Sequence, residues 1–423
     1  MQSGELAFRH AVLREAAYQL QPPSQRGLLH WHALCQMFET DRGTLSPLVH
    51  EMLAHLDAAL AAELPPDVTA DLRAREPQLL LRAADHLRFS LGSLRAVELC
   101  DRVLALPSVS TQQRVRALMA KAETLRVNGR SLEAEPLYKE ALAHLQQDDP
   151  LYAKLLSGMA AVLVLTARVE EAEQHLQTAL RLAKGQPAAS GRTVMRGALA
   201  VIRRRQGRLE EARALLEQTV AEHHAQGNRQ SECNDLGNLA NVMRDLGRFD
   251  EAESLYRQAA THAGQIGLTH GVVGAMLNLG GLLHELGRYN EARQCLLQGR
   301  EAGAEQGSVR SLALFAGNLA ALDLDSGRLD EAREGYTSAM AGLRRAGDVQ
   351  MAAAFGSEFA RLLLLMGEVA GAEAELQAAE EVLAWKSAAT LRLQAAAPVR
   401  AALQLARGDL AAAQVSLSEA RAE

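Results

Sequence analysis

The segment Gly207-Arg208-Leu209-Glu210-Glu211-Ala212 is one of a series of six-residue segments that recur at a fixed spacing of 40 residues. Close copies follow at residues 247–252 (GRFDEA), 287–292 (GRYNEA) and 327–332 (GRLDEA), and weaker copies precede them at residues 129–134 and 167–172. A constant period between about 20 and 50 residues is typical of stacked supersecondary units rather than of one closed core. The period therefore predicts a solenoid, whose function lies on a long repeated surface.

Residues 231–265 show what one unit of the solenoid contains. Two runs of apolar residues at helical spacing lie on either side of Gly247. We expect a first helix capped by Ser231 and ended by Gly247, and a second helix that begins near Asp250. The apolar residues are Leu236, Leu239, Ala240 and Met243 in the first helix, and Ala252, Leu255, Tyr256 and Ala259 in the second. Each unit is thus predicted to be an αα-hairpin.

The order of these residues resembles the tetratricopeptide repeat, in which a Leu-Gly/Ala pair precedes Gly-x-Tyr/Phe-x-Glu-Ala, an aromatic residue and a small residue. The resemblance implies an all-α, right-handed superhelical solenoid. The period of 40 residues is longer than the usual repeat of about 34, as in the repeats of kinesin light chains and spindle-orientation adaptors. We expect a helical connector over residues 1–75 and about eight to nine helix pairs over residues 76–423, with the strongest pattern in residues 110–365.

The bulk composition narrows the class of protein further. The net charge is −6 with both signs interspersed, which argues against direct nucleic-acid binding. The four cysteines form no CxxC pair and are expected to be reduced thiols. Neither a secretory signal nor an apolar run of about 20 residues is visible. The sequence therefore predicts a soluble, cytoplasmic protein with no membrane partner.

The N-terminal segment differs from the repeats. Residues 8–18 (FRHAVLREAAY) have the pattern of an amphipathic helix, and a second helix is expected from Ser24 after the Pro22-Pro23 break. This stretch resembles the connector between the ATPase module and the repeats in bacterial STAND-class signal-transduction ATPases and cyclases. The resemblance implies a sensor arm of a larger bacterial regulator, although these residues contain no GxxxxGK[ST] phosphate loop.

Asparagines recur at one position of the predicted first helices. Asn238, Asn278 and Asn318 follow one another at 40-residue spacing, and Asn234 and Asn241 lie about one turn on either side of Asn238. The family resemblance implies that this position faces the concave groove and contacts a bound peptide. An amide side chain both donates and accepts, so it can pair with the main chain of an extended peptide. The alternative is that these residues cap or link helices within the scaffold.

Arginines form a second candidate group at the ends of the first helices. Arg204 and Arg205 are expected to face the groove, and Arg244 occupies the position of Arg204 one repeat later. Guanidinium groups beside an amide row favour an acidic segment or a free carboxylate. Asp245, Glu285 and Asp325 recur nearby and partly neutralise this charge, and arginine at a helix C-terminus is also ordinary dipole chemistry.

No residue pattern predicts catalysis, a cofactor or a metal. In the segment 50–55 (HEMLAH) the two histidines are five residues apart, whereas a zinc-protease helix needs them four apart on one face. Glu211, Glu251, Glu291 and Glu331 are repeat-consensus positions, and no Gly-x-Ser-x-Gly segment occurs. The chain is therefore predicted not to be an enzyme.

The sequence thus predicts a protein-interaction scaffold or sensor for signal transduction, whose groove binds an extended peptide or a segment of a partner protein. Two alternatives remain open. The chain is the regulatory arm of a STAND-type ATPase or cyclase, or it is an oligomerisation scaffold that pairs through its solenoid ends. The second alternative rests on the apolar periodicity of the last pair, around residues 399–420, which lacks a polar capping helix.

Overall fold

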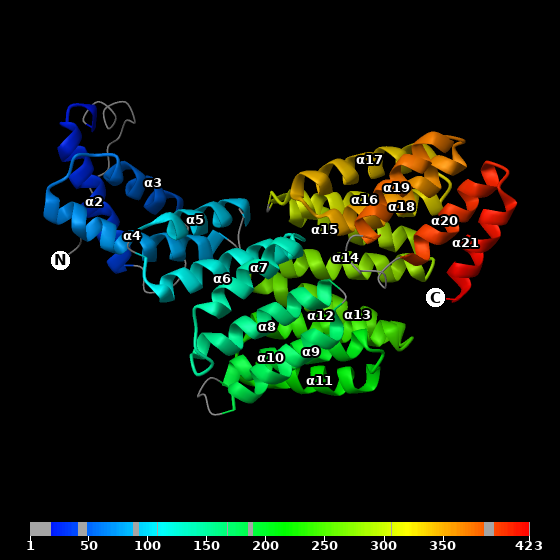
Figure 1. Ribbon diagram of the computed structural model, residues 1–423, viewed down its shortest axis with the longest axis horizontal. Coiled ribbons are helices and arrows are strands. Elements are labelled where there is room, and N and C mark those ends of the chain that lie inside the picture. Colours follow the sequence, from blue (N-terminus) through cyan, green and yellow to red (C-terminus); the bar gives the residue numbers. More distant parts are fainter. Residues whose placement is uncertain are drawn as a thin grey trace. The chain divides into compact units, whose positions relative to one another are not determined.

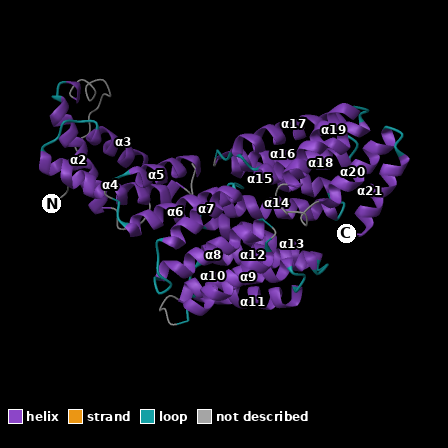
Figure 2. Cartoon of the chain, viewed as in Figure 1, coloured by secondary structure: helices purple, strands orange, loops and turns teal. Residues whose placement is uncertain are grey.

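The computed structural model describes residues 18–40, 49–87, 93–107, 109–166, 168–184, 189–305, 307–384 and 393–422. Every regular element in these ranges is an α-helix, which confirms the predicted all-α fold (Figures 1 and 2). The chain divides into two compact units, Met1–Ala120 and Lys121–Glu423. The predicted connector boundary after residue 75 falls inside one continuous helix, α4 (Pro66–Leu87).

The first unit has an apolar core of its own. Its helices before residue 111 are α2 (Pro23–Thr40), α3 (Val49–Leu60), α4 (Pro66–Leu87) and α5 (Ser93–Ala105). Leu34, Leu56, Leu80 and Leu99 are all almost fully buried in this core. The start of α2 agrees with the helix expected from Ser24. The predicted amphipathic helix at residues 8–18 lies, except for its last residue, outside the described residues.

From residue 111 onward the described chain is a succession of helix pairs (Figure 1). The pairs are α6 (Thr111–Val127) with α7 (Ser131–Ala143), α8 (Pro150–Leu165) with α9 (Val169–Leu182), α10 (Ala189–Arg205) with α11 (Leu209–Ala225), α12 (Arg229–Asp245) with α13 (Phe249–Gln265), α14 (Thr269–Glu285) with α15 (Tyr289–Glu305), α16 (Val309–Asp325) with α17 (Leu329–Ala346), α18 (Val349–Leu365) with α19 (Val369–Ala384), and α20 (Leu393–Ala406) with α21 (Leu410–Ala422). We call the earlier helix of each pair the first helix and the later one the second helix.

The helix boundaries follow from local capping. The side chain of Asn228 accepts a hydrogen bond from the backbone N–H of Ser231 at 3.3 Å, so α12 begins at Arg229. The predicted cap at Ser231 is therefore wrong, because a residue three positions earlier satisfies that N–H. The second helix begins at Phe249, and Asp250 lies in its first turn without being the cap.

The recurring Gly-Arg-x-x-Glu-Ala segment forms the turn between the two helices of a pair. Gly247 has a φ of +74°, and a Cβ added there would meet no atom within 4 Å, so glycine is needed for the backbone conformation alone. The guanidinium of Arg248 donates two hydrogen bonds to the Glu251 carboxylate, at 2.6 and 2.7 Å. Ala252 is fully buried where the two helices cross. Each consensus residue therefore has a structural role in the turn.

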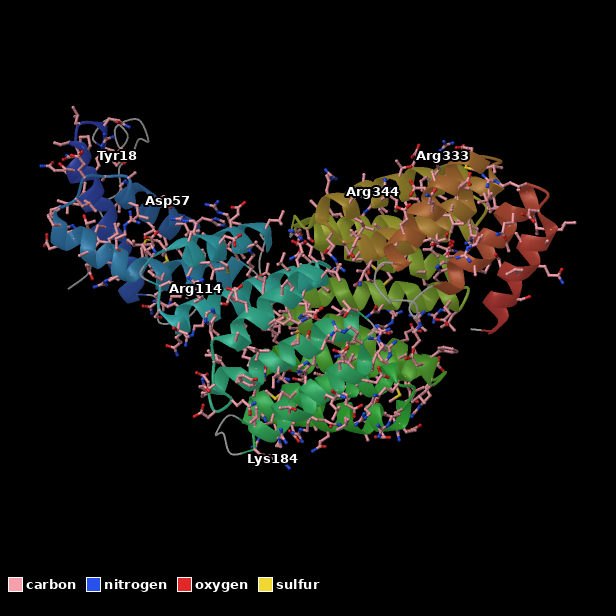
Figure 3. All side chains as sticks on the ribbon, in the orientation of Figure 1. Tyr18, Asp57, Arg114, Lys184, Arg333 and Arg344 are labelled. Carbon is pink, nitrogen blue, oxygen red and sulfur yellow. The ribbon has the colours of Figure 1, made fainter. Side chains whose placement is uncertain are left out.

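Ion pairs also join one repeat to the next on the side of the second helices. Arg288 donates to the Glu253 carboxylate at 2.5 Å. Arg333 extends from α17 (Figure 3) and donates to Glu368 at 2.6 Å. Ion pairs that are partly or fully accessible to solvent each contribute little stability. The apolar contacts between helices therefore dominate the packing of the solenoid.

One repeat junction contains buried polar side chains in place of apolar ones. Asp235 on α12 is 6% exposed and His223 on α11 is fully buried. Their Oδ2 and Nε2 atoms are 3.6 Å apart, and neither ring nitrogen of His223 has a hydrogen-bond partner among the described residues. The residues at the register position of Asp235 in the other repeats are buried and apolar: Leu155, Met195, Ala275, Phe315 and Phe355.

Burial perturbs both titratable groups at this junction. Desolvation raises the pKa of Asp235 to about 6, and the Thr219 hydroxyl beside it opposes that rise only in part. Desolvation also lowers the pKa of His223, and the charge of Arg196 adds to that effect while Glu222 and Glu232 oppose it. Compared with the unfolded chain, the folded protein therefore favours the neutral form of both side chains.

We predict that Asp235→Asn stabilises the protein at pH 8 but not at pH 4. Because the pKa of Asp235 in the folded protein exceeds its usual value of 3.8, the folded state binds more protons than the unfolded chain between these values. The free energy of unfolding therefore falls as the pH rises from about 4 to about 6, and the substitution removes that loss. Chemical unfolding at both pH values should show a gain on the order of 3 kcal/mol at pH 8. Asp250→Asn, at an exposed position, is the control, and an equal gain at both pH values would contradict the prediction.

Candidate functional site

The first helices lie on the concave side of the solenoid. Consecutive first helices contact one another directly: α8 with α10, α10 with α12, α12 with α14, α14 with α16, α16 with α18, and α18 with α20. In the described residues, consecutive second helices have no comparable backbone contacts and are bridged by long ion-paired side chains. In a curved stack the elements on the inner side approach more closely than those outside. The first helices therefore form the surface on which the predicted site residues lie.

The three asparagines of the predicted row lie at the same register on three adjacent first helices, α12, α14 and α16. Asn238, Asn278 and Asn318 are each half-buried. The Nδ2 of Asn318 donates to the Leu314 carbonyl one turn earlier, at 2.8 Å. Among the described residues, the side chains of Asn238 and Asn278 have no such partner. Two amides of the row thus keep their full hydrogen-bonding capacity, and the third keeps its oxygen as an acceptor.

The two flanking asparagines differ from each other. Asn234 is exposed on α12. The Oδ1 of Asn241 instead accepts a hydrogen bond from the buried hydroxyl of Tyr256 on α13, at 2.6 Å. Tyr138 donates to Glu123 at 3.0 Å across the same separation of 15 residues. Asn241 therefore has a partner inside its own hairpin, which supports the structural alternative for this residue.

The hydroxyl of Tyr336 lacks the partner that Tyr256 has. The residue 15 positions before Tyr336 is Ala321, which offers no acceptor. The hydroxyl is buried and has no hydrogen-bond partner among the described residues. An unpaired buried polar group costs free energy that a suitable side chain at position 321 would recover. The spacing of 15 residues between Asn241 and Tyr256 is the sequence signal from which this pairing could have been predicted.

The predicted arginines form ion pairs between neighbouring repeats. Arg204 donates from Nε to Asp245 at 2.5 Å, and Arg244 donates from Nε to Glu285 at 2.7 Å. Each pair joins a first helix to the next first helix over 41 residues. Arg205, the last residue of α10, is exposed. The acidic row anticipated from the sequence thus neutralises Arg204 and Arg244 directly.

The same pattern continues toward α18 with different residues. His284, at the position of Arg244 one repeat later, lies 2.9 Å from Asp325 through its Nε2. Arg361 donates to Asp325 at 3.1 Å and to Glu358 at 3.0 Å. Burial lowers the pKa of Arg361, but Glu358 and Asp325 outweigh this effect and the pKa is raised. The charged groups along this surface are therefore paired with one another rather than with solvent.

The described residues do not reveal a metal site. No group of three or more His, Cys, Asp or Glu side chains in these ranges could hold an ion. His55 lies against His30, with 2.6 Å between their Nδ1 atoms, and not against His50. In the same ranges, no helix is both long and apolar enough to cross a membrane.

The architecture so far defines a solenoid of antiparallel α-helical hairpins with a polar concave surface. A family model of the tetratricopeptide repeat matches residues 113–185, 192–265 and 232–303. Residues 113–185 and 192–303 are therefore tetratricopeptide repeats, as their residue pattern predicted. The family and the fold support a protein-binding scaffold.

Solved structures of low sequence identity share the fold. A Rap protein complexed with Competence and Sporulation Factor aligns with a TM-score of 0.60 and 16% identity, over 86% of this chain and 99% of that chain. A chain of the APC/C hetero-tetramer Cut9-Hcn1 aligns with a TM-score of 0.57 and 14% identity, over 97% of this chain and 71% of that chain. No curated protein sequence matches this chain.

A STAND protein with a tetratricopeptide repeat sensor from Pyrococcus horikoshii aligns with a TM-score of 0.45 and 14% identity, over 89% of this chain and 65% of that chain. This likeness is too weak to support an argument. The relation of the N-terminal segment to STAND connectors therefore stays a prediction, and residues 1–17 of that segment lie outside the described residues.

We predict that Ala321→Asn stabilises the protein by about 1 kcal/mol, because the new amide oxygen would accept a hydrogen bond from Tyr336 as Asn241 does from Tyr256. The midpoint of chemical unfolding measures the effect. The control is the same substitution in a Tyr336→Phe background, where the gain should disappear. A gain of equal size in that background would show that the tyrosine hydroxyl is not involved.

Proposed function

We propose that this protein is a non-enzymatic interaction scaffold whose concave surface binds an extended peptide or a segment of a partner protein. The observation that carries the proposal is the row of amides on α12, α14 and α16, in which Asn238 and Asn278 have no partner among the described residues. Polar groups that pair with nothing in the scaffold have their donors and acceptors available to a ligand.

The spacing of the row suits an extended main chain. Packed helix axes are about 8–10 Å apart, and an extended chain rises about 3.3 Å per residue. One amide therefore meets the ligand roughly every three residues. Three amides would contact a segment of about seven to nine residues, and they would do so through backbone groups common to every sequence.

The charges beside the row make a neutral ligand more favourable than an acidic one. Arg204 and Arg244 already donate to Asp245 and Glu285. An acidic ligand would have to displace these carboxylates, so it would gain little net electrostatic energy. Contact of Arg204, Arg205 and Arg244 with an acidic group remains the alternative, and it predicts a strong dependence of binding on salt.

The comparison with solved structures supports a ligand-binding role only in general terms. The Rap protein whose fold resembles this chain was crystallised in complex with Competence and Sporulation Factor. A solenoid of this kind thus accommodates a bound factor in that protein. The identity of the ligand in the present chain has to come from its own surface.

The test uses a library of random peptides of about twelve residues. Wild-type protein should bind a subset of them, and the triple variant Asn238→Ala, Asn278→Ala, Asn318→Ala should bind that subset at least tenfold more weakly, at roughly 1 kcal/mol per lost hydrogen bond. The control carries Gln258→Ala, Gln294→Ala and Gln298→Ala, three exposed amides on second helices. Unchanged binding by the folded triple variant, or an equal loss in the control, would refute the proposal.

The same titration distinguishes the two kinds of ligand. Raising NaCl from about 50 to about 500 mM should change the affinity less than about threefold, because the arginines on this surface are already paired. A steep loss of affinity with salt would instead indicate an acidic ligand held by Arg204, Arg205 and Arg244.

A separate observation favours self-association through the C-terminal end. Leu417 on α21 is 44% exposed, although the residues at its register position in five preceding repeats are at most 3% exposed. Those residues are Leu216, Tyr256, Leu296, Tyr336 and Leu376. Leu410 on the same helix is 70% exposed. An inner position left uncovered in this way is suited to contact with a second copy of the chain.

We therefore expect the protein to self-associate, and the double variant Leu410→Lys, Leu417→Lys to be shifted toward monomer. Sedimentation equilibrium over a range of protein concentrations measures the change. Leu365→Lys replaces a similarly exposed leucine on α18 and should leave the association unaltered. A wild-type protein that is strictly monomeric at the highest concentration would exclude this second role.

A further inference from the structure

Two regions far apart in the sequence are in contact within the second unit. Gln350, in the first turn of α18, donates from Nε2 to the backbone carbonyl of Leu165 at the end of α8, at 3.2 Å over 185 residues. Asp348 lies against Gly129, and Arg130 lies against Gly347. We call this contact, formed by residues 129, 130, 165, 347, 348 and 350, the seam.

Asp348 is held in place at the seam by α18, which it caps, and by α16 of the preceding hairpin. Its side chain is 1% exposed. Its carboxylate accepts a hydrogen bond from the Met351 backbone N–H at 3.1 Å, which caps α18, and one from Arg310 Nε at 2.7 Å. The carboxylate is therefore a fixed surface against which the other side of the seam must fit.

Gly129 fits against this surface because it has no side chain. A Cβ atom at this position would lie 2.5 and 2.8 Å from the two carboxylate oxygens of Asp348. The φ of Gly129 is +80°, which also favours glycine. Gly207, in the equivalent turn of another hairpin, has a φ of +74° with nothing within 4 Å of the same position. Position 129 therefore needs glycine for space as well as for backbone conformation, whereas position 207 needs it for backbone conformation alone.

The elements that meet at the seam lie on opposite edges of the solenoid. Gly129 lies in the turn between α6 and α7, and Leu165 is the last residue of α8, next to the turn between α8 and α9. Gly347 and Asp348 belong to a turn between hairpins, from α17 to α18. Opposite edges of a stack of hairpins meet when the stack has completed a superhelical turn. The helices with the amide row, α12, α14 and α16, lie inside that turn.

We propose that the seam locks one superhelical turn, so that the concave surface between α8 and α18 is enclosed as a channel. A ligand segment then enters along the axis with a free end, and a segment without free ends has to wait until the seam opens. The statement about the ligand rests on the proposed function, whereas the closed seam does not. One hydrogen bond and a few packed residues hold the seam, so a single substitution should shift it toward the open form.

Distance measurements without any ligand test the seam. Nitroxide labels on p-acetylphenylalanine at positions 139 and 345, two exposed sites on α7 and α17, report the separation by pulsed electron paramagnetic resonance. Wild-type protein should give one narrow distance population. Gly129→Ala should add a longer, broader population, and Gly207→Ala, with the same backbone constraint and an empty neighbourhood, should not.

A second variant guards against local misfolding of the hairpin. Gln350→Ala removes the donor to Leu165 without a backbone constraint, and it should also populate the longer distance. Identical narrow distributions in Gly129→Ala, Gln350→Ala and wild type would overturn the proposal. A broad distribution in the wild type would overturn it as well, because the seam would not then be closed.

The route of ligand entry is tested with the strongest peptide from the random library. The linear peptide should bind wild-type protein at least tenfold more tightly than the same peptide cyclised head to tail, and Gln350→Ala should narrow that difference. Equal binding of both forms to protein with a closed seam would overturn the channel. If no library peptide binds at all, the proposed function fails, and the distance measurements still decide whether the seam is closed.

Discussion

The turn within each hairpin is the constraint on which the rest of the structure depends. A glycine with positive φ ends the first helix, and the arginine that follows it pairs with the glutamate three residues later, as in Gly247, Arg248 and Glu251. The turn fixes the angle at which the second helix returns, so that Ala252 is buried at the crossing. Because this geometry recurs, the hairpins stack regularly and the first helices share one face.

The fold was predictable because the repeat period and the helical spacing are properties of the sequence itself. The helix boundaries were less predictable. Asn228 caps α12, whereas the sequence pattern suggested Ser231. Both residue types accept hydrogen bonds from backbone N–H groups, so spacing alone does not choose between them. The predicted boundary after residue 75 lies within α4, and the contacts divide the chain after Ala120.

The candidate site was predictable in register but not in its pairing. The spacing placed Asn238, Asn278 and Asn318 on equivalent positions of adjacent helices, and the structure has them there. The 40-residue period alone did not yield the hydrogen bond from Tyr256 to Asn241 or the specific ion pair of Arg204 with Asp245, although the spacing of 15 residues and the recurring carboxylates were signals for them. Those partners come from a second helix or from the next repeat, and a one-dimensional period does not distinguish which neighbour a side chain meets. The hydrogen bond from Gln350 to Leu165 joins residues 185 positions apart, so no local sequence pattern predicts it.

Departures from the repeat are more informative about function than the repeat itself. The consensus residues are accounted for by the turn and the core, so they leave little for a ligand to use. Asp235 in an apolar position and Gly129 beneath a carboxylate each impose a cost or a constraint that their equivalents in other repeats do not have. The unpaired amides differ from both, because they cost the scaffold little at a half-buried surface and still present donors and acceptors. A regular solenoid thus supplies the shape, whereas the proposed closure and the proposed binding surface depend on residues that break its regularity.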